Sequence, residues 1–279
     1  MCQQSDTTPN RRFLTKLSAG IRKALCGAII SVLFIQPALA TRNVPVQIDG
    51  NLMTGLAYVE DGVTYVPLRS LLDTFGGWDI AWDHQSKVAV AVSASNQLTA
   101  DPDTDLIALN GMNLPARVTV ENGRTYVPLR TLTEALGGKA EWDPYLGGAA
   151  VTSPDAVYDA EDLYWLSRII YAESGAESEE GQIAVGNVVL NRVNSNEFPD
   201  TISDVIFDRV DGVQFEPVEN GSVYKTPSDL SVSAAKQVLD GADVIGDAMY
   251  FYAPTLSQGV WINANRTYFK TIGCHRFYL

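Results

Sequence analysis

The sequence predicts an α+β protein with two folded parts, and three observations support this prediction. The chain has 279 residues, of which 46% are hydrophobic and 19% charged, which is typical of a globular protein with more than one core. A strand-rich segment is duplicated within residues 44–153, which predicts a small repeat domain. Helical periodicity followed by short aromatic runs predicts an α+β domain over residues 158–279.

The N-terminal segment has the pattern of an export signal. Basic residues precede an apolar run from Ala24 to Ile35, and Ala38-Leu39-Ala40 offers a small-residue cleavage site. About a dozen apolar residues are too few to span a bilayer. We therefore expect residues 1–40 to be a signal peptide, with an uncleaved signal anchor as the alternative, and no stable membrane span after cleavage. Cys274 is then the only cysteine left, so no internal disulfide is expected.

The charge of the chain limits its partners. The formal net charge is -13 at pH 7, and the predicted signal peptide carries more basic than acidic residues, so the exported chain is more acidic still. Such a surface argues against nucleic acid and against an anionic membrane as partners. The sequence does not predict an oligomeric state.

The clearest internal feature is a duplication. "VTYVPLRSLLDTFGG" at 63–77 recurs as "RTYVPLRTLTEALGG" at 124–138. Each copy predicts strand, turn, strand, helix, strand, because an Asp-Gly or Asn-Gly pair suits a hairpin turn and is followed by β-prone residues. In the first copy Pro67 closes a strand and opens a helix over residues 68–75, which Gly76-Gly77 ends.

Arg69 and Arg130 occupy the same position in the two copies. Each either braces its own repeat, which we favour, or binds a ligand. With the doubled "TYVPLR", residues 44–153 resemble the copper amine oxidase N-terminal-like, or stalk, domain. The resemblance implies a domain that spaces or attaches a catalytic partner at the wall. It implies no copper, because His84 is the only histidine here and no second imidazole or thiol lies nearby in the sequence.

Helices dominate the start of the second predicted domain. Asp159 or Asp162 caps a helix whose apolar residues recur at helical spacing and which Gly175 ends, so that Glu173 lies close to the packed side. A second helix starts near Glu179, runs to Val193 and is apolar nearly all round, which predicts a buried helix. Its amides, Gln182, Asn187 and Asn191, bond either neighbouring backbone or a sugar.

The rest of this domain combines one more helix with strands. Thr226-Pro227-Ser228 predicts the start of a helix that ends at Gly241. The runs "GVQFEPV", "AMYFYAP" and "HRFYL" predict short strands.

The titratable residues exclude several classes of enzyme. Beyond residue 40 the only histidines are His84 and His275, in different predicted domains, so a zinc site with several histidines cannot form within one of them. Cys274 and His275 are adjacent, and adjacent side chains on a strand point to opposite faces, so they cannot act as nucleophile and base. A zinc amidase therefore lacks ligands. Carboxylate chemistry remains, as in glycoside cleavage, and it requires no metal or cofactor.

Glu173 is the best candidate for a general acid. Glycoside cleavage needs an acid that is protonated at the working pH, and the apolar neighbours Ile169 and Ile170 favour a raised pKa through desolvation. Glu177 is either a second carboxylate or a structural cap, since Gly175 interrupts the helical spacing between the two acids.

Residues 160–279 resemble the SleB/CwlJ-type cell-wall hydrolase family. The resemblance rests on "YAESGAESEEGQIAVGNVVLNRV", "FP", "VQFEPV" and "TIGCHRFY", in this order. It implies a lysozyme-like catalytic domain, secreted and cell wall associated, that acts on peptidoglycan glycan strands. Glu173 follows an aromatic and a small residue, as the family's single catalytic glutamate does. Many family members have a small residue followed by arginine between the two glutamates that correspond to Glu173 and Glu177. This chain has Ser174-Gly175-Ala176 there instead, which leaves the substrate contacts of this loop undefined.

The resemblance also implies the reaction. Glu173 protonates the oxygen that joins N-acetylmuramic acid to N-acetylglucosamine and then, in a lytic transglycosylase, accepts the proton of the muramoyl 6-hydroxyl. The candidates for substrate binding are Tyr171, Gln182, Asn191, Gln214, Phe215, Tyr252 and His275. The alternative for the aromatic residues, which occur at strand spacing, is that they pack in the core. The competing function is a non-catalytic peptidoglycan-binding wall protein.

Overall fold

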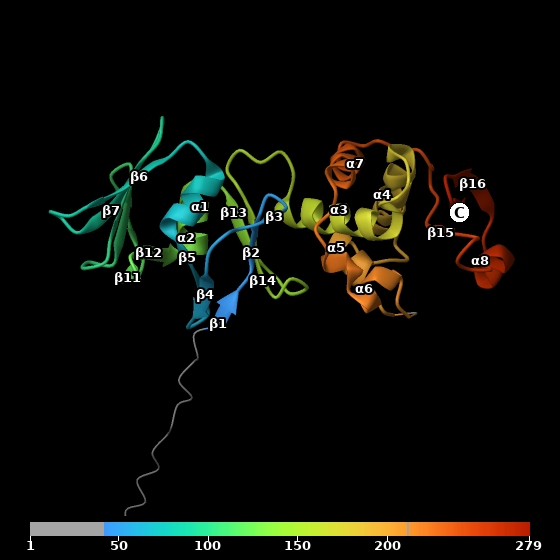
Figure 1. The fold of residues 1–279 in the computed structure, drawn as a ribbon, viewed down its shortest axis with the longest axis horizontal. Helices are drawn as coiled ribbons and strands as arrows, with labels where there is room; N and C mark the ends of the chain where they lie inside the picture. Colours follow the sequence, from blue (N-terminus) through green and yellow to red (C-terminus); the bar gives the residue numbers. More distant parts are fainter. Residues whose placement is uncertain (1–41, 211) are drawn as a thin grey trace, which may run out of the picture. The chain divides into compact units, whose positions relative to one another are not determined.

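The structure is a computed structural model that describes residues 42–210 and 212–279 (Figure 1). The predicted signal peptide lies outside these residues. Helices and strands are both present, which confirms the α+β class. Within the described ranges, no helix has the length and apolar character needed to cross a membrane.

The two repeat copies fold in the same way. The first comprises β4 (Ala57–Glu60), β5 (Val63–Pro67), α1 (Leu68–Phe75), β6 (Asp79–Asp83) and β7 (Val88–Val92). The second comprises β11 (Thr119–Glu121), β12 (Arg124–Pro128), α2 (Leu129–Ala135), β13 (Lys139–Asp143) and β14 (Gly148–Thr152). The predicted order of strand, turn, strand, helix, strand is confirmed.

The hairpin turns explain the Asp-Gly and Asn-Gly pairs. Asp61 and Gly62 have φ of 52° and 79°, and Asn122 and Gly123 have φ of 52° and 74°. A two-residue hairpin turn with positive φ at both central residues favours this composition, because glycine lacks a Cβ and Asp or Asn tolerates the left-handed region.

The copies meet along β5 and β12, which pair antiparallel. Val66 lies opposite Val127, Tyr65 opposite Pro128 and Pro67 opposite Tyr126. These are equivalent positions in the two copies, so the pairing has a local twofold relationship centred on the two valines. The sheet has the order β1-β4-β5-β12-β11, with β1 at Arg42–Val44. Helix α1 contacts β12 and helix α2 contacts β5, so each helix packs on the strand of the other copy.

Two further sheets complete this domain. One has the order β10-β9-β8-β7-β6, with β8 (Gln97–Asp101), β9 (Leu106–Leu109) and β10 (Met112–Pro115). The other has the order β13-β14-β2-β3, with β2 (Val46–Ile48) and β3 (Asn51–Leu52). Apolar residues of both repeat helices fill the core, among them Leu68, Leu71, Leu72, Leu129 and Leu132.

The second domain consists of helices and one small sheet. Its helices are α3 (Ala160–Ser174), α4 (Glu179–Val193), α5 (Ile202–Phe207), α6 (Glu216–Asn220), a 3₁₀ turn (Ser222–Tyr224), α7 (Asp229–Leu239) and α8 (Val260–Asn265). The sheet order is β15-β17-β16, with β15 (Tyr250–Tyr252), β16 (Tyr268–Ile272) and β17 (His275–Tyr278).

The helix starts follow from their capping residues. Asp159 Oδ1 accepts a hydrogen bond from the backbone N–H of Glu161 at 2.9 Å, which makes it the cap of α3. Ser178 caps α4 and Ser228 caps α7 in the same way. Each cap binds one of the free N–H groups of the first turn. All three helices thus begin at or beside the residues that the sequence indicates.

Helices α3, α4 and α7 pack closely around Gly186 of α4 (Figure 1). A Cβ at this position would lie 2.9 Å from methyl groups of both Ile170 in α3 and Val238 in α7. The absent side chain therefore allows α4 and α7 to approach α3, the helix that carries the candidate acid Glu173.

One predicted strand is wrong. In "GVQFEPV" the chain turns into helix α6 at Glu216, with Phe215 as its N-cap and Pro217 in its first turn. Proline suits this position because its missing N–H is not needed there and its φ is already helical. The other two aromatic runs contain strands β15 and β17, as predicted.

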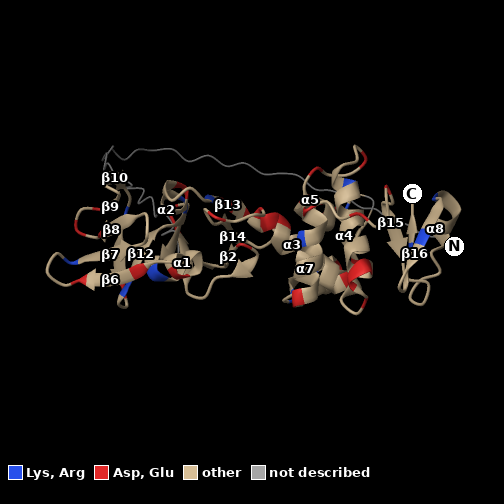
Figure 2. Cartoon of the chain, turned by 90° about the horizontal axis from the view of Figure 1, so that it is seen from above, with Lys and Arg blue, Asp and Glu red and all other residues tan. Residues whose placement is uncertain are grey.

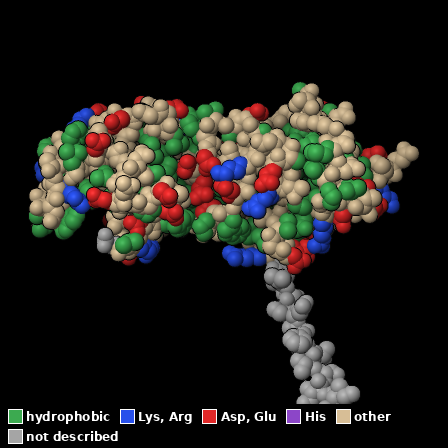
Figure 3. All heavy atoms as spheres, turned by 180° about the vertical axis from the view of Figure 1, so that it is seen from behind, with side chains coloured by type: hydrophobic (Ala, Val, Ile, Leu, Met, Phe, Trp, Pro, Cys, Tyr) green, Lys and Arg blue, Asp and Glu red, His purple; other side chains and the backbone are tan. Residues whose placement is uncertain are grey.

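Acidic side chains are spread over the surface. Figure 3 shows them in red over much of one face, with fewer basic side chains in blue, in keeping with the net charge of -13. Figure 2 shows basic and acidic residues side by side near the labels of β6, β12 and α1.

Candidate active site

Glu173 lies in the last turn of α3, beside a cavity of about 450 Å³. Tyr171, Ala172, Gly175 and Ala176 line the same cavity, together with Ser222 and Lys225 from the segment after α6. The helix ends at Ser174 with Gly175 as its C-cap, so Glu173 is carried by a packed helix and borders an open cavity. This is the arrangement that a proton donor requires.

The surroundings of Glu173 favour its protonated form. Burial and, to a smaller extent, the charge of Glu216 raise the pKa of its carboxyl group to about 7, and the charge of Arg192 opposes this rise. A carboxylic acid with a pKa near 7 is half protonated at neutral pH and can both donate and accept a proton.

Arg192 is a buried cation near this acid. Its side chain lies in the last turn of α4 and only 5% of the residue is exposed. Its Nε donates to the carbonyl oxygen of Met249 at 2.8 Å and its Nη1 donates to Gln214 Oε1 at 3.3 Å. Burial lowers the pKa of Arg192 to about 10, while nearby Tyr250, Asp208 and Glu173 oppose this change.

Aromatic rings surround the Arg192 guanidinium. The centroids of Phe198, Phe215 and Tyr250 lie 4.8, 5.2 and 5.5 Å from its Cζ atom. These distances are those of cation–π contacts, which hold the guanidinium in place. Its charge is therefore fixed where it acts on Glu173.

A groove of about 920 Å³ extends from Arg192. Gln214, Tyr250, Trp261 and Arg266 line it, and Trp261 is 56% exposed. The Arg266 guanidinium carbon lies 4.2 Å from the Tyr250 ring centroid and 5.4 Å from that of Trp261. Aromatic faces beside amide and guanidinium donors form a surface suited to sugar rings and their hydroxyl groups.

Comparison with known proteins identifies both domains. Residues 176–278 match the family described as cell wall hydrolase, and residues 47–151 match the copper amine oxidase N-terminal domain. The second domain is a cell wall hydrolase domain. Glu173 precedes the matched segment of this hydrolase domain, so its role rests on the geometry described above.

Several relatives are named spore cortex-lytic enzymes. The chain is 34% identical over 141 residues to the enzyme from Oceanobacillus iheyensis, which covers 50% of each chain. It is 32% identical over 120 residues to the enzyme from Bacillus subtilis, which covers 43% of this chain and 38% of that one. The match thus spans half or less of these relatives.

A solved structure is also similar. It is the catalytic domain of the germination-specific lytic transglycosylase SleB from Bacillus anthracis, at 36% identity and a TM-score of 0.41, and the match covers 44% of this chain and 98% of that chain.

Two predicted binding residues lie at the cavities of the hydrolase domain. Tyr171 lines the cavity of Glu173, and Gln214 lines the groove and accepts the hydrogen bond from Arg192. Both remain candidates for contact with a substrate.

The structure corrects three aromatic or imidazole predictions. Phe215 is buried beneath Arg192, and Tyr252 is buried with its hydroxyl near Asn263. His275 is buried with its ring edge-on to Phe251, and burial lowers the pKa of its imidazole. All three side chains are thus packed inside the domain, and none of them lines the groove.

The predicted sugar contacts of two amides are also corrected. Gln182 is fully buried, donates to the carbonyl oxygen of Glu177 at 3.2 Å and accepts from Ser231 Oγ at 2.7 Å. Asn191 donates to the carbonyl oxygens of Gly246 and Ala248 at 2.6 and 2.9 Å. Both hold loops of the domain, which is the alternative that buried amides commonly follow.

Glu177 has a structural contact. Its Oε2 accepts a hydrogen bond from the backbone N–H of Cys274 at 3.2 Å, and a Cβ at Gly273 would collide with its carboxylate. Glu177 therefore holds the turn between β16 and β17, which supports the cap alternative. Cys274 is exposed in this turn, and His275 is buried at the start of β17.

Sequence reasoning missed the charged groups that surround Glu173. Glu216 was hidden because its segment was interpreted as a strand. Arg192 was hidden because a single arginine at the end of an apolar helix is usually solvated. In the sequence, no acidic residue lies three or four positions from Arg192. This was the only available signal that the arginine has a partner elsewhere than on its own helix.

Proposed function

We propose that the protein is a secreted, cell-wall-associated enzyme that cleaves the bond between N-acetylmuramic acid and N-acetylglucosamine in peptidoglycan, as a lytic transglycosylase with Glu173 as its single catalytic carboxylate. The observation that carries this proposal is the Glu173 carboxyl group, whose pKa is raised to about 7 beside an open cavity. The cell wall hydrolase match supports the class of substrate.

The reaction needs one group that first donates and then accepts a proton. Protonated Glu173 donates its proton to the bridging oxygen as the glycosidic bond breaks, which leaves an oxocarbenium-like muramoyl unit. The Glu173 carboxylate then accepts the proton of the muramoyl 6-hydroxyl while its oxygen bonds to the anomeric carbon. The product contains a 1,6-anhydro ring, no water is consumed, and Glu173 returns to its protonated form.

Arg192 and Glu216 adjust this cycle in opposite directions. The charge of Glu216 favours the protonated acid that starts the reaction, and the charge of Arg192 favours the carboxylate that forms after the first step. A pKa close to 7 makes neither protonation state costly. One carboxylate is then sufficient for both proton transfers.

The groove supplies the binding surface in this proposal. Tyr250, Trp261 and Arg266 offer ring faces and donors to sugars in the groove, and Tyr171 and Lys225 line the cavity of Glu173. The names of the relatives suggest spore cortex as the source of the glycan.

Digestion of purified peptidoglycan tests the proposal. The wild type, Glu173→Gln and the control Glu177→Gln are each incubated with the polymer, and the released muropeptides are weighed by mass spectrometry. We expect products one water lighter than hydrolysis yields from the wild type and from Glu177→Gln, and none from Glu173→Gln. Products with ordinary reducing ends would instead indicate a hydrolase, and no release from any wall, cortex included, would favour the non-catalytic binding protein.

A further inference from the structure

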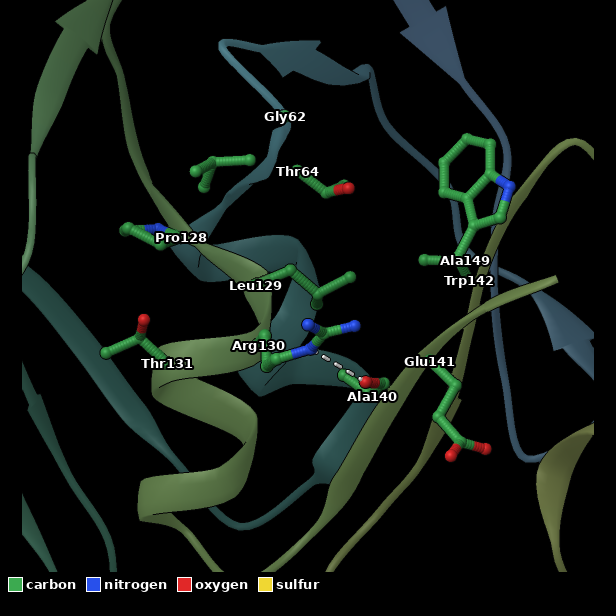
Figure 4. A pocket seen from close by; sticks show the side chains of 11 residues that line it. Gly62, Thr64, Pro128, Leu129, Arg130, Thr131, Ala140, Glu141, Trp142 and Ala149 are labelled. Atoms are coloured by element: carbon green, nitrogen blue, oxygen red, sulfur yellow. Dashed lines mark hydrogen bonds between the residues drawn. The ribbon is translucent and has the colours of Figure 1, made fainter.

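The stalk-like domain contains two clefts that the duplication makes equivalent. The α1 cleft, of about 580 Å³, lies between the start of α1 with β6 and the β11–β12 hairpin of the other copy. The α2 cleft, of about 320 Å³, lies between the start of α2 with β13 and the β4–β5 hairpin (Figure 4). Each cleft is thus built from one helix of one copy and one hairpin of the other.

Both clefts contain an arginine and a tryptophan at matching positions. Arg69 Nη2 donates to the carbonyl oxygen of Ile80 at 2.7 Å, and Arg130 Nε donates to that of Ala140 at 3.1 Å. Figure 4 shows the second of these bonds, together with Trp142, which lies on the same strand β13 as Ala140. Each arginine therefore braces its own repeat, as expected, yet each guanidinium also borders a cleft that Trp82 or Trp142 lines.

The clefts differ in charge. Arg124 of the α1 cleft stands where the α2 cleft has Val63, and Ala81 stands where the α2 cleft has Glu141. The α1 cleft therefore holds Arg69 and Arg124, and within the described part of the chain none of its lining residues carries a carboxylate. The α2 cleft holds one arginine and one glutamate.

A concentrated positive charge is unusual on this protein, whose net charge is -13. Figure 2 shows both blue and red residues near the labels of β6, β12 and α1, and of these charged residues the arginines Arg69 and Arg124 line the α1 cleft. Helix α1 adds to the effect, because its first turn contains no acidic residue and its N-terminal N–H groups favour an anion. The two arginines place forked donors within one cavity.

We propose that the α1 cleft binds a muropeptide unit of peptidoglycan through a free carboxylate of its stem peptide, because the carboxyl group of N-acetylmuramic acid itself is joined to that peptide by an amide bond. Trp82 offers an aromatic face to the sugar ring, and Arg69 and Arg124 offer charge-assisted hydrogen bonds to the carboxylate. This proposal rests on the proposed function for the identity of the polymer. Its consequence is that one chain holds the wall at two places, which raises the effective concentration of glycan at Glu173.

The test measures the binding of full-length parent and variant proteins to peptidoglycan. All of them carry Glu173→Gln, which keeps the polymer intact. The variant Arg124→Val with Ala81→Glu gives the α1 cleft the residues of the α2 cleft, so the repeat already accommodates both side chains. We expect the Kd for insoluble peptidoglycan, stripped of phosphate polymers, to rise about three- to tenfold, with a weaker dependence on salt. The control Arg130→Gln, in the α2 cleft, should change the Kd by less than about twofold.

The same substitutions are also made in the protein that keeps Glu173, and its cleavage of a short soluble glycan is measured. This second assay separates the cleft proposal from the proposed function. Unchanged cleavage with weakened wall binding supports the cleft. Equal wall affinity of variant and parent overturns it. An affinity loss seen only on walls that retain phosphate polymers also overturns it, since the ligand is then a phosphate polymer. If the wild type cleaves no glycan, the proposed function fails, while the comparison of Kd values still decides the cleft.

Discussion

Replacement of Glu173 by glutamine should stabilise the fold at high pH while removing activity. The pKa of the carboxyl group rises from an ordinary value of 4.5 to about 7 in the folded protein. Between these values the unfolded chain ionises and the folded protein does not, so wild-type stability falls as pH rises from 4.5 to 7 and the loss is complete above 7. The difference corresponds to about 3 kcal/mol. Glutamine stays neutral throughout.

Urea unfolding at pH 4 and pH 8 measures this effect. We expect Glu173→Gln to match the wild type at pH 4 and to exceed its free energy of unfolding by about 3 kcal/mol at pH 8. Glu219→Gln removes the same charge from an exposed position, so any change that it causes is subtracted as the general effect of charge. An equal difference at both pH values, or a less stable Glu173→Gln at pH 8, would refute the desolvation of Glu173.

Three further substitutions test the surroundings of the acid. Glu216→Gln removes a charge that raises the Glu173 pKa, so the alkaline limb of the pH–activity profile should move to lower pH by less than about one unit, whereas complete loss of activity would assign Glu216 to the chemistry. Arg192→Lys loses the planar contacts with three rings and should lower the free energy of unfolding by about 1–2 kcal/mol in thermal melts; an unchanged Tm would contradict this. Gly186→Ala should cost about 1–3 kcal/mol in denaturant unfolding despite a better helix propensity, and a gain would show that the helices can separate there.

The sequence predicted the elements whose signals are local. Both hairpin turns, helix α1 and the caps of α3, α4 and α7 follow from neighbouring residues, because turn chemistry and capping depend on few positions. The prediction of a strand at Glu216 is wrong because it followed the alternation of apolar and polar residues. The Glu-Pro pair, which starts a helix there, was the better signal.

The candidate site was predictable only in part. Glu173 was found because its apolar neighbours and the helix end are adjacent in the chain. Arg192 and Glu216 reach it through tertiary packing, which no local pattern encodes. Tyr252 and His275 were predicted to contact substrate but are buried. A strand pattern assigns residues to two faces and does not indicate which face meets solvent.

The antiparallel pairing of β5 with β12 restricts how this repeat domain can change in length. Without the second copy, β5 would become an open edge and α1 would lose the strand on which it packs, with Leu68, Leu71 and Leu72 uncovered. A single copy is thus half of a folding unit. We therefore expect repeats to be inserted or deleted in pairs. A chain with an odd number of copies would expose an unpaired strand edge, which can form hydrogen bonds with another chain.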